Sequence, residues 1–352
     1  MYIVIAILIF GVLITVHEAG HFAAARLCGV KVVEFAIGMG PKIFRREGRE
    51  TLFTLRALPI GGFCAMEGED EESDDPRAFS NQKAYKKFII LAAGSAMNFI
   101  LGFLILFSIM HPASFRPATI TSFAEGCPYV GEDALMEGDT IYKVEGERIY
   151  FSSNVSLYLS RRNTSTTDLV IIRDGKKIEL DDFHMVPVEY EVDGEKQMRY
   201  GLDFGVTEGG ILARLKYSWY QAIDYVRLVR VSLVDLFTGA AGIRDLSGPV
   251  GIVSIMNDVA QESETTGIAI LNILGITSFI TINLSVMNML PIPALDGGRI
   301  LFMFISMAVE KVMRRKLNPK YEGYVHAAFL VALFGLMAFV MINDIVRIVA
   351  GA

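Results

Sequence analysis

Four long stretches of this sequence carry almost no charge, and they constrain the fold more than any other feature. They are Tyr2–Ala25, Phe88–Met110, Gly267–Leu290 and Val325–Ile342. Each is about long enough to cross the ~30 Å hydrocarbon core of a bilayer as a helix. The first basic residue is Arg26, so the first stretch lacks the basic start of a signal peptide and we expect it to be retained. The sequence therefore predicts a polytopic α-helical membrane protein with about four transmembrane helices.

The composition agrees with a membrane protein and excludes other classes. The 352 residues are 52% hydrophobic and 20% charged, with a mean hydropathy of +0.42. These values are too apolar for an ordinary soluble domain or a disordered chain. The net charge of −6 offers no basic face, so we expect no nucleic acid partner. The three cysteines are far apart in the sequence and odd in number, which predicts neither a disulfide framework nor a cysteine metal site.

Basic residues in the connecting segments predict the orientation in the membrane. Residues 27–87 contain ten Lys or Arg side chains, and residues 299–324 contain six. No basic residue precedes the first span, and only Arg347 follows Ile342. Because short cytoplasmic loops are enriched in Lys and Arg, both basic segments are expected in the cytoplasm. Both termini and the insert between the second and third spans are then extracytoplasmic.

Composition divides the chain into four parts. They are an N-terminal membrane part (1–111), a β-rich extracytoplasmic domain (112–205), an interfacial region (206–266) and a C-terminal membrane part (267–352). Strand-like alternation begins near Thr119, Thr140 and Asp168, and turn signals occur at Glu145-Gly146 and Asp174-Gly175. We also expect a short helix near Val130–Met136.

The interfacial region is expected to contain a helix that lies on the membrane surface. Residues Leu215–Phe237 are apolar but contain five charges, and Asp224, Arg227 and Arg230 fall on one helical face. Trp219 near the start is typical of an interfacial anchor. A fifth span stays open as the alternative.

The strongest chemical signal is His17-Glu18-Ala19-Gly20-His21 within the first span. Histidines four residues apart project from one face of a helix, within reach of one metal ion. Glu18 lies beside them, placed to take a proton from water. Ionisable residues in membrane spans are rare and usually functional, which favours a metal site over a structural polar patch.

Two histidines leave a catalytic zinc one protein ligand short. Asp296 is the first acidic residue after the third uncharged stretch, and Pro291 and Pro293 precede it. Prolines break a helix, and broken backbone at membrane depth must be buried or line a cavity. An aspartate there needs a cation, but it could equally cap the following helix. From spacing alone, both roles stay open.

HEAGH in the first span and Asn288-Met-Leu-Pro-Ile-Pro-Ala-Leu-Asp-Gly-Gly298 after the third resemble the site-2 protease family of intramembrane zinc metalloproteases (peptidase M50). Within this family, the sequence is similar to the bacterial RseP/RasP-like regulator-of-sigma proteases. Further matches support the resemblance over nearly the whole chain. They are Phe35–Pro41 with its Gly38-x-Gly40 segment, the hairpin motif at Pro59–Phe63, the Gly94–Asn98 pattern, Leu246–Gly251, and Cys127–Ile149, which resembles part of a PDZ domain.

The resemblance implies a role for each matching residue. His17, His21 and Asp296 would hold one Zn²⁺, and Glu18 would be the catalytic acid and base. Asn288 would hold the substrate backbone. Gly38 and Gly40 would belong to a membrane-associated β-hairpin region that pairs with the extended substrate. One PDZ-like domain fits in the insert, and the acidic run Glu67–Asp75 is expected to be a solvated loop.

The implied activity is hydrolysis of peptide bonds within the transmembrane segments of single-span membrane proteins. Anti-sigma factors and remnant signal peptides are the expected substrates, trimmed first by an upstream site-1 protease, and a bacterial plasma membrane is the expected location. Two alternatives stay open: a membrane-anchored PDZ scaffold without proteolysis, and a metal transporter. The scaffold would need neither Glu18 nor Asp296.

Overall fold

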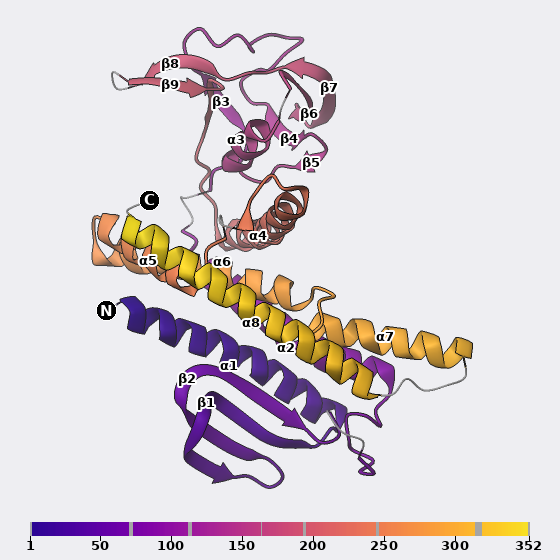
Figure 1. The fold of residues 1–352 in the computed structure, drawn as a ribbon. Helices are drawn as coiled ribbons and strands as arrows, with labels where there is room; N and C mark the ends of the chain where they lie inside the picture. Colours follow the sequence, from indigo (N-terminus) through magenta and orange to yellow (C-terminus); the bar gives the residue numbers. More distant parts are fainter. Residues whose placement is uncertain are drawn as a thin grey trace. The chain divides into compact units, whose positions relative to one another are not determined.

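The computed structural model describes residues 2–69, 73–111, 115–162, 164–192, 195–243, 246–313 and 319–350. The chain forms two compact units (Figure 1). One combines Met1–Ile109 with Tyr225–Ala352, and we call it the membrane unit. The other is Met110–Asp224, and we call it the inserted unit.

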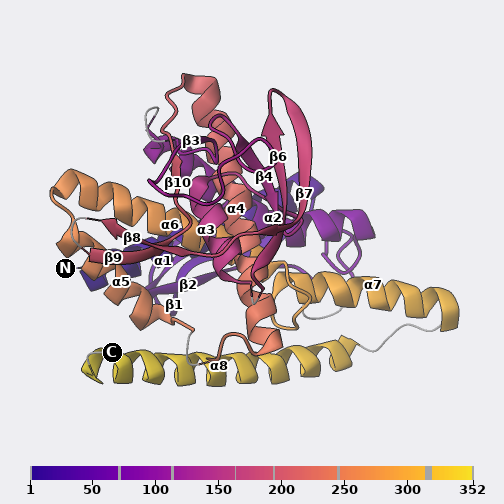
Figure 2. The ribbon, with the colours of Figure 1, turned by 90° about the horizontal axis from the view of Figure 1, so that it is seen from above.

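Four helices of the membrane unit are long and apolar enough to span a bilayer. They are α1 (Tyr2–Cys28), α2 (Ala84–Ile109), α6 (Thr266–Asn288) and α8 (Pro319–Ala350), with spanning portions Val4–Cys28, Ala84–Ile109, Thr266–Asn288 and Gly323–Ala350. All four predicted stretches therefore form helices of the expected length and apolarity. Two further helices, α5 (Pro249–Glu262) and α7 (Asp296–Met313), also belong to this unit, and Figure 2 shows α8 along its edge.

Small residues let the spanning helices approach closely. A Cβ atom at Gly20 of α1 would lie 2.4 Å from the carbonyl oxygen of Ala93 on α2. On α2, a Cβ at Gly102 would lie 2.6 Å from Cγ1 of Ile282 on α6. Both distances are below any normal contact, so α1, α2 and α6 can pack as they do only with glycine at these positions.

A bent two-stranded sheet follows α1 directly. In this sheet β1 (Val32–Glu47) pairs with β2 (Leu52–Met66). Residues 34–37 pair with 62–65 on one side and with 52–55 on the other. The segment 62–66 is therefore a sheet edge among the described strands. The hairpin predicted from the resemblance is present.

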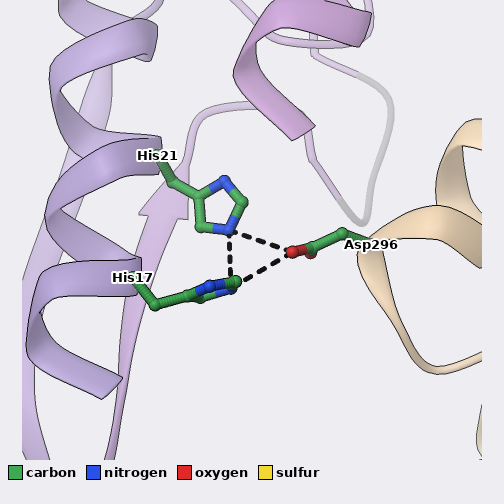
Figure 3. Close-up of side chains that lie close together, drawn as sticks. All are labelled: His17, His21 and Asp296. Carbon is green, nitrogen blue, oxygen red and sulfur yellow. Dashed lines mark hydrogen bonds and ion pairs between the residues drawn. The ribbon is translucent and has the colours of Figure 1, made fainter. Parts of the chain in front are cut away.

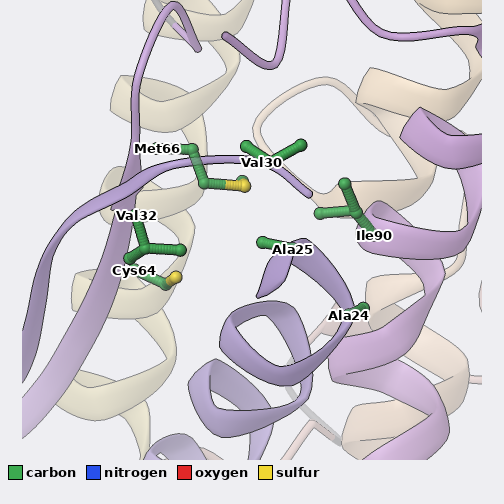
Figure 4. Packing of buried hydrophobic residues seen from close by; sticks show 7 residues of the cluster. All are labelled: Ala24, Ala25, Val30, Val32, Cys64, Met66 and Ile90. Carbon is green, nitrogen blue, oxygen red and sulfur yellow. The ribbon is translucent and has the colours of Figure 1, made fainter. Parts of the chain in front are cut away.

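Apolar side chains attach this edge to the ends of α1 and α2 (Figure 4). The buried cluster consists of Ala24, Ala25, Val30, Val32, Cys64, Met66 and Ile90. Cys64 and Met66 alternate along β2, so one face of this strand packs on the helices, as period-2 patterning requires. The sheet edge is thus held beside the C-terminal half of α1.

The inserted unit is rich in short strands, as predicted. They are β3 (Ile120–Phe123), β4 (Thr140–Val144), β5 (Glu147–Arg148), β6 (Thr166–Arg173), β7 (Lys176–His184), β8 (Val188–Val192), β9 (Glu195–Arg199) and β10 (Leu202–Phe204), with helix α3 (Ser152–Ser160). A four-stranded sheet has the order β5-β4-β6-β7, and β3 pairs with β10 and β8 with β9. Both predicted turn signals lie between paired strands.

The helix expected near Val130–Met136 is wrong. These residues form turns, with a bridge between Val130 and Leu135. The guanidinium of Arg173 donates to the carbonyls of Glu132 and Ala134, at 2.7 and 2.8 Å. A distant side chain thus satisfies carbonyls that a helix would have paired locally.

The stretch Leu215–Phe237 lies within one helix, α4 (Ile211–Thr238). Among the described residues, four helices qualify as candidate membrane spans, and α4 is not one of them. The predicted charged face of this helix is not exposed throughout. Asp224 is buried and accepts a hydrogen bond from the Asn154 side-chain amide at 2.9 Å. Helical periodicity predicted that Asp224 lies on the charged face of the helix, but it could not predict that the Asn154 side chain pairs with it.

The predicted break after the third span is also present. Residues 289–295, between α6 and α7, form turns, as Pro291 and Pro293 require. Ala294 has a φ of +80°, a left-handed conformation that is costly for a residue with a Cβ. This loop delivers Asp296 as the first residue of α7.

The Leu246–Gly251 motif is explained by a buried carboxylate on α8. Asp344 Oδ2 accepts hydrogen bonds from the backbone N–H groups of Gly248 and Gly251, at 2.9 and 2.8 Å. These N–H groups lie at the N-terminus of α5, where a negative charge is favourable. A Cβ at Gly251 would lie 3.0 Å from Asp344 Oδ1, which explains the glycine.

Candidate metal centre

Helix α1 and the start of α7 bring three candidate metal ligands together (Figure 3). Nε2 of His17 lies 3.1 Å from Nε2 of His21. Oδ2 of Asp296 lies 3.1 Å from the former and 3.4 Å from the latter. Both histidines are buried, at 8% and 7% exposure. The i,i+4 spacing on α1 directs both rings to one side, where the carboxylate of Asp296 meets them.

A backbone carbonyl sets the tautomer of His21. Its Nδ1–H donates to the carbonyl oxygen of Ile90 on α2, at 2.8 Å. The proton is therefore on Nδ1, and the lone pair of Nε2 faces the other two ligands. This is the arrangement that a metal-binding histidine needs.

His17 also has a neighbour on α2, in this case a side chain. The Asn98 amide of α2 lies 3.4 Å from its Nδ1. The oxygen and nitrogen of an amide are interchangeable in such a fit. With Oδ1 toward the ring, Asn98 accepts from Nδ1–H and leaves Nε2 of His17 free to bind a metal.

The donor set fits zinc. In neutral His21 the inward nitrogen carries no proton, and Asp296 Oδ2 is buried without a hydrogen-bond donor in the described structure. Lone pairs this close repel one another unless a cation lies among them. Two ligand atoms on a tetrahedral zinc, each about 2.0–2.1 Å from the metal, are roughly 3.3 Å apart, which matches the spacing found here. Two imidazoles and one carboxylate also leave one coordination position open, as a catalytic zinc requires.

Gly94 of α2 creates the room for this cluster. A Cβ atom there would lie 2.4 Å from Nε2 of His21 and 2.8 Å from Nε2 of His17. The missing side chain thus gives the ligand atoms their space, while the same helix supplies the Ile90 carbonyl and Asn98.

Glu18 follows His17 on α1 and lies against the sheet edge. A Cβ atom at Gly62 of β2 would be 3.5 Å from Cγ of Glu18. Glu18 is half-buried, so its carboxylate is neither sealed in the core nor fully in solvent. The candidate acid/base thus lies between the ligand-bearing helix and the edge segment 62–66.

The remaining predicted site residues are not in the cluster itself. Asn288 is the last residue of α6 and is half-buried. Gly38 and Gly40 have φ values of +83° and +86° and form the bend of β1. A Cβ at Gly38 would lie 2.5 Å from the Leu58 carbonyl, so the closeness of two chain segments accounts for this glycine.

Cys64, buried near Glu18, is a poor candidate for a further ligand. Burial, together with the nearby carboxylates of Glu18 and Glu69, raises the pKa of its thiol to about 12. Because zinc binds the thiolate, a thiol that stays protonated at neutral pH does not compete for the metal.

An ion pair that sequence analysis missed connects the sheet to α7. Arg299, one turn after Asp296, bonds through its guanidinium to the Glu69 carboxylate. Glu69 also accepts from the backbone N–H of Met66 at 3.2 Å, at the end of the edge segment. This pair therefore holds the helix that carries Asp296 against the sheet.

The described part of the acidic run lies in a loop, as predicted, but two of its carboxylates are paired with other side chains. Besides Glu69, Glu67 pairs with Lys31 at 3.2 Å and accepts from Ser73 at 2.9 Å. Residues 70–72 of the run lie outside the described residues. No local motif indicated the pairings with Lys31 and Arg299, because both partners are far from the run in the sequence.

Comparison with known proteins now gives the family. The model of peptidase family M50 matches residues 5–336, nearly the whole chain. The chain belongs to peptidase family M50. A relative from Clostridium acetobutylicum with a zinc metalloprotease name is 34% identical over 349 residues, covering 98% of this chain and 97% of the relative. The regulator of sigma-W protease RasP of Bacillus subtilis is 28% identical over 433 aligned positions, covering 97% of each chain.

Family membership determines the general activity. This M50 protein is a site-2 type zinc metalloprotease with a catalytic zinc, and its four apolar helices make it a multi-pass membrane protein. The RasP of Bacillus licheniformis, named zinc metalloprotease, is also 28% identical, over 97% of this chain. The resemblance inferred from HEAGH and the Asp296 motif is confirmed at the level of family and enzyme class.

Proposed function

We propose that this protease hydrolyses peptide bonds within or near the transmembrane segment of single-span membrane proteins. In this proposal His17, His21 and Asp296 hold the zinc and Glu18 is the acid/base. The observation that carries it is the convergence of three buried ligand atoms, two of them on a spanning helix, beside a free sheet edge.

Zinc bound here would polarise the scissile carbonyl and lower the pKa of water. Glu18 accepts a proton as the water oxygen attacks the carbonyl carbon. When the C–N bond breaks, Glu18 returns this proton to the leaving amine. The products are an amine and a carboxylic acid, which releases its own proton to water, and Glu18 ends in its starting state.

The sheet edge and Asn288 are proposed to hold the substrate backbone. A helical substrate must unwind before its carbonyls are accessible, and an extended chain can add to the edge segment 62–66 through main-chain hydrogen bonds. Gly62 places this edge next to Glu18. Gly38 and Gly40 contribute by bending β1, so that residues 34–37 pair with the same edge.

We further propose anti-sigma factors and remnant signal peptides as substrates, trimmed first by a site-1 protease. The name of the Bacillus subtilis relative, a regulator of sigma-W protease, supports the first class. The β-rich inserted unit is proposed to be a PDZ-like domain that selects trimmed substrates. In this topology it lies outside a bacterial plasma membrane with both termini, and water reaches the metal from the cytoplasmic side.

Removal of the metal tests the proposal directly. Purified protein in liposomes, given a single-span model substrate, is expected to lose cleavage on treatment with a zinc chelator and to regain it with about one zinc per chain. Loss occurs because the remaining side chains supply no electrophile. Cleavage that persists in zinc-free protein would reject the metal site. Zinc that binds but exchanges across the vesicle, without cleavage, would favour transport. A requirement for the inserted unit alone would favour a scaffold.

Asn288 gives a second test. Asn288→Leu is expected to lower kcat/KM about 10-fold, because one hydrogen bond to the substrate backbone contributes about 1.4 kcal/mol. Zinc content should not change. Asn272→Leu, sixteen residues earlier on α6 and roughly 24 Å away along the helix axis, is the matched control. Equal losses in both variants would argue against the assignment.

A further inference from the structure

A histidine of the fourth span touches the loop that carries the third metal ligand. Nδ1 of His326 on α8 accepts a hydrogen bond from the backbone N–H of Ala294, at 2.8 Å. Ala294 precedes Asp296 by two residues. The contact joins segments 32 residues apart and lies within the membrane unit.

The 289–295 loop is stabilised by few hydrogen bonds between its own residues. Its internal bonds are short-range, from Ile292 N–H to the Leu290 carbonyl at 2.7 Å and from Leu295 N–H to the Ile292 carbonyl at 3.1 Å. Between them Ala294 has the left-handed φ of +80°. Such a conformation costs roughly 1–3 kcal/mol and persists only where surrounding contacts determine it. The bond to His326 is one such contact.

The 289–295 loop also packs tightly against the residues that follow Asp296, so the loop backbone determines the position of Asp296. A Cβ at Gly297 would lie 2.3 Å from the Leu290 carbonyl oxygen, and one at Gly298 would lie 2.2 Å from that of Ile292. The first turn of α7 is therefore folded tightly onto the loop. A change in the backbone at Ala294 must move Asp296 as well.

The ring of His326 also contacts α7. It lies 5.3 Å from the ring of Phe302, centroid to centroid, at an interplanar angle of 48°. His326 thus contacts the chain both before and after Asp296. Because Nδ1 accepts a hydrogen bond, the ring is neutral and carries its proton on Nε2.

We propose that His326 is a positioning residue for the metal ligand Asp296. It orders the 289–295 loop through the Ala294 N–H group and so sets where the carboxylate meets His17 and His21. This inference rests on the proposed role of Asp296 as a zinc ligand. It makes the fourth span part of the metal site, although α8 supplies no ligand.

The test separates the acceptor atom from the bulk of the ring. His326→Leu removes the acceptor, whereas His326→Asn keeps one near the Nδ1 position through its Oδ1. Phe329→Leu, at an exposed position one turn along α8, is the matched control. The readouts are zinc affinity by chelator competition, and the absorption spectrum of the cobalt-substituted protein, which reports ligand geometry without requiring activity.

We expect His326→Leu to weaken zinc binding about 10-fold or more and to change the cobalt spectrum, as loss of an outer partner does at metal sites. His326→Asn and Phe329→Leu should resemble wild type. Unchanged binding and spectrum in His326→Leu would overturn the inference, and so would equal defects in the Leu and Asn variants. Asp296→Ala is measured in parallel: if it retains zinc at wild-type affinity, the proposed site itself is wrong.

Discussion

Replacing Gly94 by alanine is expected to weaken zinc binding and proteolysis severely while leaving the protein folded. The added methyl group would lie 2.4 Å from Nε2 of His21 and 2.8 Å from Nε2 of His17, so the metal-binding atoms themselves must move. His21 cannot turn away without losing its bond to the Ile90 carbonyl. Overpacking of this kind costs about 1–3 kcal/mol, and we expect zinc affinity to fall at least about 100-fold.

Gly275→Ala is the matched control for Gly94→Ala. Gly275 is also a glycine within a spanning helix, but a Cβ there would lie 3.8 Å from Cδ1 of Ile109, an ordinary contact. This variant should bind zinc and cleave like wild type. Zinc content by elemental analysis and unfolding temperature would be measured for both. Wild-type zinc affinity in Gly94→Ala would contradict the site geometry.

The membrane architecture was predictable because it depends on local sequence alone. A run of uncharged residues long enough to span a bilayer has few alternatives to a helix. The i,i+4 spacing of His17 and His21 likewise directs both side chains to one face without reference to any other part of the chain. Pro291 and Pro293 predicted the break before Asp296 for the same reason.

The surroundings of the metal site were not predictable, because they depend on pairings between distant segments. The Ile90 carbonyl that orients His21 carries no sequence signal, since every residue has one. Arg299 and His326 each look like one more polar residue near a helix end. Asn98 stood in a motif, but only helix packing shows that it faces His17.

The third ligand shows how sequence and structure combine. Spacing left Asp296 equally suited to cap a helix or to bind a metal. In the structure it is the first residue of α7, and its carboxylate also meets both histidines. The contact with both histidines, which spacing could not show, favours the metal-binding role.

Glu18→Gln is expected to stop cleavage without removing the metal. Glutamine has nearly the same shape but cannot accept and return the proton, and general acid–base catalysis typically contributes about 10²–10⁴-fold to the rate. Because the ligands in this proposal are His17, His21 and Asp296, the variant should keep about one zinc per chain. The measurement is single-turnover cleavage of a single-span substrate, with zinc content determined on the same preparation.

The decisive comparison for Glu18→Gln is with a charge-neutralising change elsewhere on the same unit. Glu47→Gln removes an exposed carboxylate at the end of β1, whose partner Arg45 lies 3.8 Å away. Such surface pairs contribute little, so this variant should retain wild-type turnover. Full activity in Glu18→Gln would remove Glu18 from the mechanism. Loss of both zinc and activity would instead make Glu18 part of the metal site. Retained zinc with lost turnover assigns it the proton transfer, because only that step distinguishes a carboxylate from its amide at this position.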